Sequence, residues 1–301
     1  MAITVATFFS FKGGAGRSTT CLNTVPFLAK KLNADERHPI LLVDTDIESC
    51  GMTYLLNSQE FFRKNTVDVK ELLQEDLNFS IEDEGSFANH SLFKHFMPVG
   101  EYFGVASRAV LFLGVDDGKE VNRSRISGQY QQCMASLRKA AKNNGARAVI
   151  MDSAAGDQFA ARLSVDIANN IVVCMRPTSQ FRAGTFSYLK RLNARVGENL
   201  SSNKKIILLP TVVPADLEID GVSQLGSAVS DIAERVSALD NLPVNTTFVQ
   251  DSKFFGINEI KRFKWMEGVL FRLPKEQLAD DEKQAIERYS KLAEVIASYG
   301  N

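Results

Sequence analysis

The sequence predicts an α/β fold of three layers, in which a mostly parallel, twisted sheet is flanked by helices. The first observation behind this prediction is a series of short apolar runs that lack alternating polar positions. Such runs are typical of strands buried on both faces, as in a parallel sheet covered by helices. The second observation is that stretches of helical character lie between these runs, and this alternation predicts right-handed crossover connections.

The apolar runs are expected to form the strands of the sheet. In chain order they lie at residues 3–9, 40–44, 109–115, 147–152, 170–175 and 205–213. They are rich in Val, Ile, Leu and Phe, which pack well on a pleated, buried surface. Because ligands bind beyond the carboxyl ends of the strands in an open α/β sheet, the residues that follow these runs are the candidates for a functional site.

The segments between and after the runs are expected to form helices. They lie at residues 18–33, 128–144, 158–168, 181–196, 221–239 and 275–299. Pro26 falls inside the first helix, where a proline removes a backbone donor, so we expect this helix to be kinked or shortened. The last helix has one apolar face but an acidic start, so we expect it to pack against the sheet and not to contact a membrane.

Composition and charge limit the class of protein. With 35 Lys and Arg against 36 Asp and Glu, the net charge is −1, which argues against a purely electrostatic binder of nucleic acid or membranes. Stretches free of charged side chains reach only 12 residues, whereas a membrane-spanning helix needs about 20 apolar residues. Because the N-terminal segment also lacks the pattern of a secretory signal, we expect a cytoplasmic protein.

The alternation of strands and helices continues along the whole chain, so residues 1–301 are expected to form a single domain. The least regular part, at about 58–101, contains an acidic cluster. We expect it to be a variable elaboration of the same domain, because a separate domain of about 40 residues would be hard to stabilise.

A glycine-rich segment, SFKGGAGRST at residues 10–19, stands between the first strand and the first helix. Closely spaced glycines allow successive backbone amides to turn inward around an anion, and the N-terminus of the following helix adds its dipole. The segment therefore predicts a phosphate-binding loop. It departs from the standard GxxxxGK(S/T) pattern at Phe11, in the first glycine position, and at Arg17, in the lysine position.

The string KGGAGRST resembles the deviant Walker A motif, KGGxGK(S/T), of the ParA/MinD family of P-loop ATPases. The resemblance implies the P-loop NTPase fold, ATP and Mg²⁺ as ligands, and a homodimer in the ATP state. Lys12 would then reach across the dimer interface to the nucleotide of the partner subunit. Ser18 would ligate Mg²⁺, and Thr19 would lie near the α-phosphate. The residues implied in the phosphate cradle are Gly13, Gly14, Ala15, Gly16, Arg17, Ser18 and Thr19.

Two further segments resemble family motifs. In ILLVDTDIES, the position of Asp44 implies a carboxylate near the Mg²⁺ shell, and that of Asp46 implies the residue that positions the attacking water. Placing this water is the main requirement for hydrolysis of a phosphoanhydride, so a carboxylate there is chemically sensible. In RAVIMDSAAG, which resembles the Walker B strand and switch II, Asp152 would hold Mg²⁺ through water and the Gly156 amide would contact the γ-phosphate.

Two departures from the family pattern affect the expected chemistry. Arg17 keeps the positive charge of the usual lysine, but its planar, longer side chain is not an equivalent point charge, so we expect ATP binding with slow catalysis. Near the end of the last expected strand, Pro210 and Thr211 replace the asparagine that commonly recognises adenine in the family. Recognition of the base would then use Thr211, backbone groups or a later loop.

Residues 253–275 combine cations with aromatic side chains, and their six cations against two Glu give a local charge of +4. The cations are Lys253, Lys261, Arg262, Lys264, Arg272 and Lys275. The family resemblance implies nonspecific DNA contact in this half of the fold, for which Lys253, Lys261, Arg262, Lys264 and Arg272 are the candidates. In the alternative interpretation, the aromatic side chains belong to the core and the cations solvate one face.

Together these features predict an ATP-dependent molecular switch. Two subunits would associate around nucleotide, hydrolysis would release them, and the dimer would position, recruit or regulate a protein activator or a cargo. Two alternatives remain open from the sequence. The first is a nucleotide-binding interaction protein without turnover, because of Arg17, and the second is a small-molecule enzyme that uses phosphoryl activation on the same fold.

Overall fold

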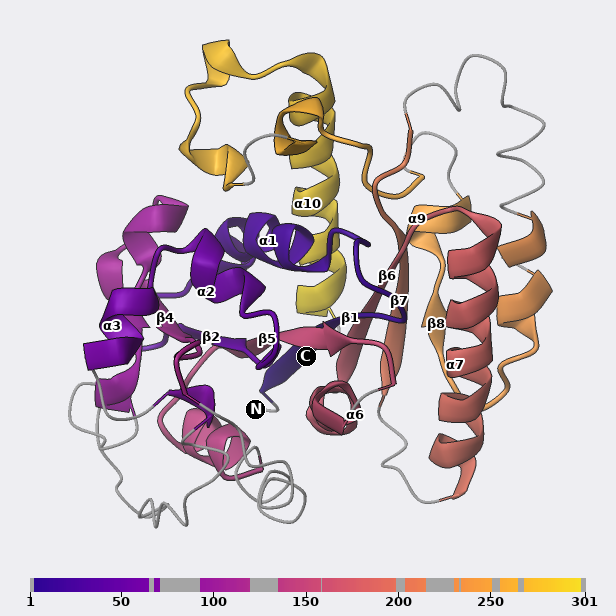
Figure 1. The fold of residues 1–301 in the computed structure, drawn as a ribbon, viewed down its shortest axis with the longest axis horizontal. Coiled ribbons are helices and arrows are strands. Elements are labelled where there is room, and N and C mark those ends of the chain that lie inside the picture. The colour runs from indigo at the N-terminus through magenta and orange to yellow at the C-terminus, as the bar shows by residue number, and fades with distance from the viewer. Residues whose placement is uncertain are drawn as a thin grey trace.

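The computed structural model contains one eight-stranded sheet with helices on both faces (Figure 1). The structure describes residues 3–64, 68–70, 93–119, 135–157, 159–198, 204–214, 230–232, 234–250, 255–264 and 268–298. Seven pairs of neighbouring strands form the sheet, and only the pair at one edge is antiparallel. The expected fold class, a mostly parallel sheet flanked by helices, is confirmed.

The strands follow the order β3-β4-β2-β5-β1-β6-β7-β8 across the sheet. Their bounds are β1 Thr4–Ser10, β2 Ile40–Asp44, β3 Met97–Pro98, β4 Val110–Leu113, β5 Ala148–Ala155, β6 Asn170–Met175, β7 Lys205–Pro210 and β8 Val244–Asn245. All six expected runs form strands, and β2 and β6 have the expected bounds. The sequence did not predict β3 and β8, because two residues are too few to form a recognisable apolar run.

The helices occupy most of the segments where they were expected. Their bounds are α1 Arg17–Lys31, α2 Gly51–Leu55, α3 Gln59–Lys64, α6 Phe159–Ile167, α7 Ser179–Glu198, α9 Thr247–Gln250 and α10 Asp280–Ser298. Residues 135–143 are also helical, whereas 128–134 and 221–229 of the expected helices lie outside the described residues. The same holds for 71–92 of the elaboration expected at about 58–101, so the assignment of residues 1–301 to one domain stays a prediction.

Helix α1 continues through Pro26, so the expectation that it is shortened there is wrong. A proline in a helix interior costs about 3 kcal/mol through the lost hydrogen bond and steric conflict. Leu22, Val25 and Leu28 of α1 are buried, and full burial of such a side chain contributes about 1.5–3 kcal/mol. Packing of the apolar face therefore outweighs the local cost of Pro26.

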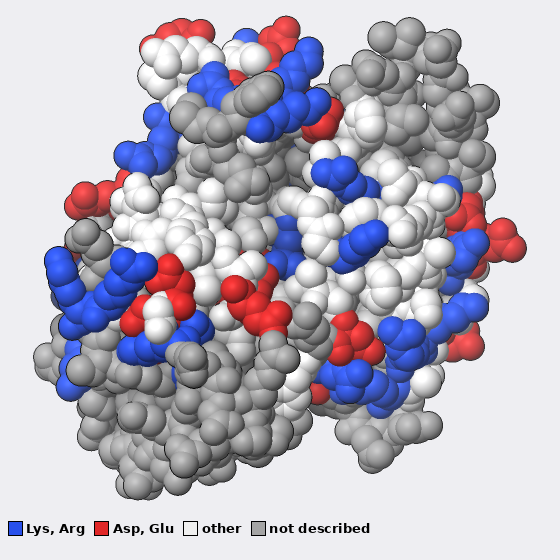
Figure 2. Space-filling model, in the orientation of Figure 1, with Lys and Arg blue, Asp and Glu red and all other residues white. Residues whose placement is uncertain are grey.

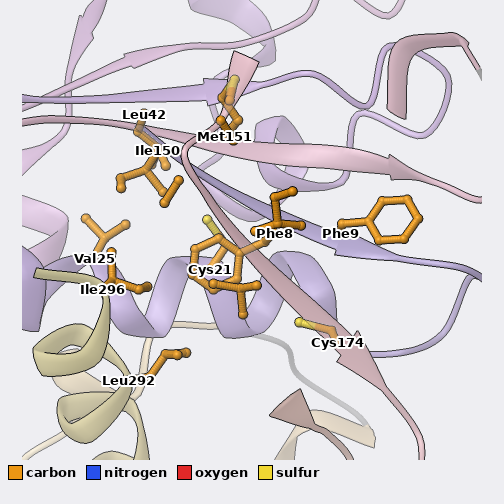
Figure 3. Packing of buried hydrophobic residues seen from close by; sticks show 14 of the residues in the cluster. Phe8, Phe9, Cys21, Val25, Leu42, Ile150, Met151, Cys174, Leu292 and Ile296 are labelled. Carbon is orange, nitrogen blue, oxygen red and sulfur yellow. The ribbon is translucent and has the colours of Figure 1, made fainter. Parts of the chain in front are cut away.

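The core lies on both sides of α1, which is sandwiched between the sheet and α10 (Figure 3). Val25 of α1 lies near Leu292 and Ile296 of α10, while Phe8 and Ile150 of the sheet pack on the opposite side. All five side chains are fully buried. The last helix therefore packs on the fold as expected, although mainly through α1 and only to a small extent on the sheet.

The strand order places β1 at the point where the chain changes direction across the sheet. From β1 the chain runs to β2 on one side, and from β5 it runs to β6 on the other side of β1. Right-handed crossovers then put α1 and α6 on opposite faces, as Figure 1 shows. Such a switch point leaves a crevice beyond the carboxyl ends of the strands, where the glycine-rich segment lies.

Phe11 anchors the start of this segment on α7. A Cβ atom built on Gly184 of α7 would collide with Cδ1 and Cε1 of the Phe11 ring. The side chain that replaces the first glycine of the standard motif therefore packs against a helix position that has no side chain.

We predict that Gly184→Ala destabilises the protein by about 1–3 kcal/mol in urea unfolding, because the new methyl group overpacks against Phe11. In a Phe11→Ala background the same substitution should be neutral or stabilising by up to about 1 kcal/mol, since alanine favours helix. Gly268→Ala is the control, because no other described residue, its chain neighbours aside, has an atom within 4 Å of its added Cβ. An effect of Gly184→Ala that is the same in both backgrounds would contradict this contact.

Candidate functional site

The glycine-rich segment has the backbone conformation of an anion-binding loop. Gly14 and Gly16 have φ values of +79° and +66°, in the left-handed region that favours glycine. The carbonyl of Gly14 accepts a hydrogen bond from Arg176 Nε at 2.8 Å, and that of Ala15 accepts one from Thr211 Oγ1 at 2.7 Å. Because the carbonyl and the next N–H of a trans peptide point in opposite directions, the amides of Ala15 and Gly16 point away from these donors.

A pocket of about 440 Å³ lies over the loop and the first turn of α1. Its lining residues are Ser10, Gly13, Gly14, Ala15, Gly16, Arg17, Ser18, Thr19, Asp46, Glu48, Ser49, Gly51, Leu55, Ala154 and Ala155. The N-terminus of a 15-residue helix and several backbone amides face a concave space there. This arrangement suits a phosphate group, because both the amides and the helix dipole favour negative charge.

A second pocket of about 260 Å³ adjoins the first at Gly14, Gly16 and Thr19. Arg176, Thr211, Val212, Phe263 and Tyr289 are among its lining residues. Thr211, the residue expected to recognise the base, lines this pocket, although its hydroxyl hydrogen is donated to the loop. Val212 has a φ of +53°, a costly conformation for a β-branched residue that is often found at functional sites.

The three predicted carboxylates meet beside the loop. Asp44 ends β2 and is paired in register with Asp152 of β5, while Asp46 follows in the loop after β2. Arg17, at the start of α1, lies among them. Its Nε donates to Asp152 Oδ1 at 3.0 Å, its Nη2 to Asp46 Oδ2 at 2.7 Å and its Nη1 to Ser10 Oγ at 3.2 Å.

We call the ion pairs of Arg17 with Asp46 and Asp152 the Arg17 clamp. All three residues are buried, with exposed fractions of 9%, 5% and 0%. Charge-assisted hydrogen bonds of this kind are strong, and removal of one partner of a buried ion pair typically destabilises a protein by about 3–5 kcal/mol. The resemblance implies that residue 17 lies against phosphate, whereas in the structure its guanidinium lies on the two carboxylates.

Burial determines the protonation of this cluster. Burial alone lowers the pKa of Arg17, but the carboxylates of Asp152 and Asp46 raise it above its ordinary value, so Arg17 stays charged. Burial also raises the pKa of Asp152, against the opposing effect of Arg17. Burial and then the charge of Asp152 raise the pKa of Asp44 to about 7, although the backbone N–H and hydroxyl of Thr53 both donate to Asp44 Oδ2.

The other predicted residues have varied surroundings. Lys12 is exposed, and its Nζ donates to Gln180 Oε1 at 3.0 Å near the start of α7. Ser18 and Thr19 line the first pocket. The amide of Gly156 donates to the carbonyl of Ser10 at 2.9 Å. This hydrogen bond would have to break before the Gly156 amide could contact a phosphate.

The sequence analysis missed three residues of the site. Arg176 directly follows an expected strand, so the rule that ligands bind at carboxyl ends of strands was the signal that could have identified it. Ser10 was assigned only to the loop and not to the hydrogen bond that its Oγ accepts from Arg17. Thr53 contacts Asp44 from α2, nine positions along the chain, and nothing in the local pattern indicates this contact.

The donors expected for Mg²⁺ fit a cation held mainly by a bound nucleotide. Asp152 Oδ2 is buried and has no hydrogen-bond partner among the described residues, which is the state of an oxygen available to a hard cation. Within the same residues, no three His, Cys, Asp or Glu side chains form a group that could hold a metal alone. Mg²⁺ usually binds through one or two protein ligands together with phosphates and water, which matches Ser18 and Asp152. Both oxygens of Asp44, the third expected donor, accept hydrogen bonds within the protein, so its contact with the metal stays a prediction.

The basic segment expected to contact DNA already has partners within the chain. Arg262 pairs with Glu282 at 2.6 Å, and Lys264 pairs with Glu259 at 3.2 Å. The Arg272 guanidinium lies 4.9 Å from the centre of the Tyr102 ring. Lys and Arg side chains nevertheless gather over this segment, drawn in gold in Figure 1, on the face shown in Figure 2.

The DNA contact therefore stays a prediction, and Lys253 lies outside the described residues. Among the helices that the structure describes, none is long and apolar enough to cross a membrane.

Comparison with known proteins finds similarity only at the level of structure. No family model and no curated protein matches the sequence. The cell-division ATPase MinD of Pyrococcus furiosus has a TM-score of 0.60 at 14% identity, over 97% of this chain and 99% of that chain.

Two further solved structures contain nucleotide. An ATP complex of a McdA variant from Cyanothece has a TM-score of 0.57 at 16% identity, over 98% of this chain and 97% of that chain. Cobyrinic acid a,c-diamide synthase of Mycobacterium smegmatis, with a bound ATP analogue and magnesium, has a TM-score of 0.59 at 17% identity, over 97% and 93% of the two chains. At these identities the shared feature is the fold.

The raised pKa of Asp44 predicts a pH dependence of stability. The folded chain holds this proton more tightly than the unfolded chain, whose Asp pKa is about 3.9. The contribution of Asp44 to the free energy of unfolding therefore falls as the pH rises from about 4 to about 7 and stays constant above that range.

We expect Asp44→Asn to flatten this decline in urea unfolding between about pH 5 and about pH 8 in buffer with EDTA. Asp35→Asn is the control, because turn hydrogen bonds lower the pKa of this exposed carboxyl and place its titration below that range. An equal slope for the Asp44→Asn variant and the unmodified protein would contradict the assignment.

Proposed function

We propose that this chain is an ATP-binding molecular switch that hydrolyses ATP slowly and forms a dimer around the nucleotide. The observation that carries the proposal is the meeting of an anion-binding loop with three carboxylates: Asp44 at the end of β2, Asp46 in the loop after it, and Asp152 in the C-terminal half of β5. The loop provides backbone amides for phosphates. Of the three carboxylates, Asp46 lines the first pocket, and we assign it as the acceptor for water. We assign Asp152, which pairs with the same guanidinium as Asp46, as the metal ligand of a triphosphate bound there.

The two adjoining pockets suit the two ends of a nucleotide. The pocket over the loop would take the phosphates, and the pocket lined by Arg176, Thr211 and Phe263 would take the base. Support for ATP comes from the McdA and synthase structures, which share the fold and contain ATP and an ATP analogue. Ser18 and Asp152 would hold Mg²⁺, which would neutralise charge on the phosphates.

Lys12 supports the proposed dimer. It is the exposed cation of the loop, and among the described residues its Nζ donates to the neutral side chain of Gln180 and lies 5.9 Å from the centre of the Phe181 ring. Such a contact is easily exchanged for a phosphate, since charge-assisted bonds to phosphate are stronger. We therefore assign Lys12 to the phosphates bound by the second subunit. A protein activator or cargo would recognise the dimer.

We predict that ATP, but not ADP, raises the mass from 33.3 kDa to about twice that value in light scattering. Lys12→Ala should abolish the shift, because it removes the cation that bridges the subunits. Lys31→Ala, which changes an exposed lysine at the end of α1, should leave it intact. A monomer that binds ATP without any change of mass would rule out the switch.

We predict that Asp46→Asn lowers the rate of phosphate release by about 100-fold or more, while ATP binding persists and the dimer accumulates. The amide keeps the shape of the side chain but cannot act as an anionic acceptor for the water. Glu48→Gln, in the same pocket, is the matched control and should change the rate far less. Equal rates for the two variants would remove Asp46 from the reaction.

The Arg17 clamp favours a second candidate function, a nucleotide-binding protein that does not turn over. In the structure the clamp holds Asp46 Oδ2 at 2.7 Å, so this oxygen is not available to water while the clamp is closed. Saturable ATP binding without phosphate release by the unmodified protein would select this candidate over the first.

A further inference from the structure

The buried carboxylates beside the loop are paired with a cation of the protein itself, the Arg17 guanidinium. Asp46 and Asp152 are buried, and in the part of the chain that the structure describes both form their ion pairs with Arg17. Asp44 is the register partner of Asp152 on the adjacent strand. One guanidinium therefore supplies the positive charge for a buried group of carboxylates.

We propose that Arg17 occupies a latent divalent-cation site, and that Mg²⁺ and the Arg17 guanidinium compete for Asp46 and Asp152. The proposal deepens the proposed function, because a nucleotide would drive this exchange. The competition itself, however, involves only the protein and the metal ion and can be measured without nucleotide.

The geometry of the Arg17 clamp supports a cation position between the two carboxylates. Nε and Nη2 of Arg17 approach Asp152 Oδ1 and Asp46 Oδ2 at 3.0 and 2.7 Å. These oxygens come from two different elements, β5 and the loop after β2, and both face the same guanidinium. Carboxylate oxygens are the preferred protein ligands of Mg²⁺, so the space taken by Arg17 has the donors of a hard-cation site.

An unpaired oxygen on Asp152 provides a second, independent observation. Asp152 is fully buried, and its Oδ2 has no hydrogen-bond partner among the described residues. A planar guanidinium satisfies only the oxygens along its donor edge, whereas Mg²⁺ keeps several of its waters, which can donate to a carboxylate oxygen outside that edge. The Arg17 clamp therefore binds Oδ1 of Asp152 and leaves Oδ2 of the same carboxylate for a further ligand.

The described residues also explain why Mg²⁺ alone should not displace Arg17. Breaking a buried ion pair leaves an uncompensated charge, and Mg²⁺ loses its water ligands reluctantly. A triphosphate in the adjacent pocket changes this balance, because it offers the guanidinium a bidentate anionic partner. Arg17 would move to phosphate, and the metal ion would replace it at Asp152. Asp46 would then no longer pair with the guanidinium and could position water.

The test measures thermal unfolding of nucleotide-free protein in MgCl₂ and in KCl of equal ionic strength. We expect Arg17→Gln to gain several degrees in Tm at about 10 mM MgCl₂, and the unmodified protein to gain less than about 1 °C, because a ligand stabilises only where its site is open. Arg17→Gln with Asp46→Asn should lose most of the gain. Arg63→Gln, which removes an exposed partner of Asp117, is the control and should show none.

A second variant, which keeps the positive charge, covers the case in which Arg17→Gln does not fold. Arg17→Lys keeps one compact cation that cannot span both carboxylates, so it should lower the MgCl₂ concentration that half-saturates ATP binding by at least about 3-fold.

The proposal is overturned if neither variant responds to Mg²⁺ more than the unmodified protein does. It is also overturned if the unmodified protein, without nucleotide, is stabilised as much as Arg17→Gln. Failure of the unmodified protein to bind ATP, together with the expected Mg²⁺ response of Arg17→Gln, would instead contradict the proposed function.

Discussion

Burial of negative charge at the end of β2 and at the neighbouring position of β5 is the constraint on which the rest of the site depends. The register of these strands places Asp44 beside Asp152, and Asp46 follows two residues after Asp44. Carboxylates in such a position require a counter-charge or a proton. Arg17 supplies the charge for Asp46 and Asp152, while Asp44, with a pKa raised to about 7, depends on Thr53 and on protonation.

The position of this counter-charge depends on the fold around α1. Left-handed Gly16 ends the loop and turns the chain into α1, so that residue 17 lies in its first turn next to the strand ends. Packing of α1 between the sheet and α10 then fixes this turn, and Phe11 fixes the other end of the loop against Gly184. The loop, the clamp and α7 are therefore parts of one packed unit, and a ligand that moves Arg17 would act on all of them.

Local patterns predicted the fold and the location of the site better than they predicted its contacts. The apolar runs at 40–44 and 170–175 became strands with those bounds, because a buried strand is recognisable from its own residues. The partners of Arg17 were not predictable, since Asp152 lies 135 positions away and meets it only through strand order and register. The expectation that α1 is shortened at Pro26 was wrong for a related reason, because packing against α10 stabilises the helix beyond this residue.

The central claim of this account is that Arg17 changes partners when a nucleoside triphosphate and Mg²⁺ enter the site. The most direct measurement is a crystal structure of the chain grown with a non-hydrolysable ATP analogue and MgCl₂. The account predicts that the Arg17 guanidinium contacts phosphate oxygens and no longer contacts Asp46, with Mg²⁺ next to Ser18 and Asp152. A bound analogue with Arg17 still bridging Asp46 and Asp152 would contradict it.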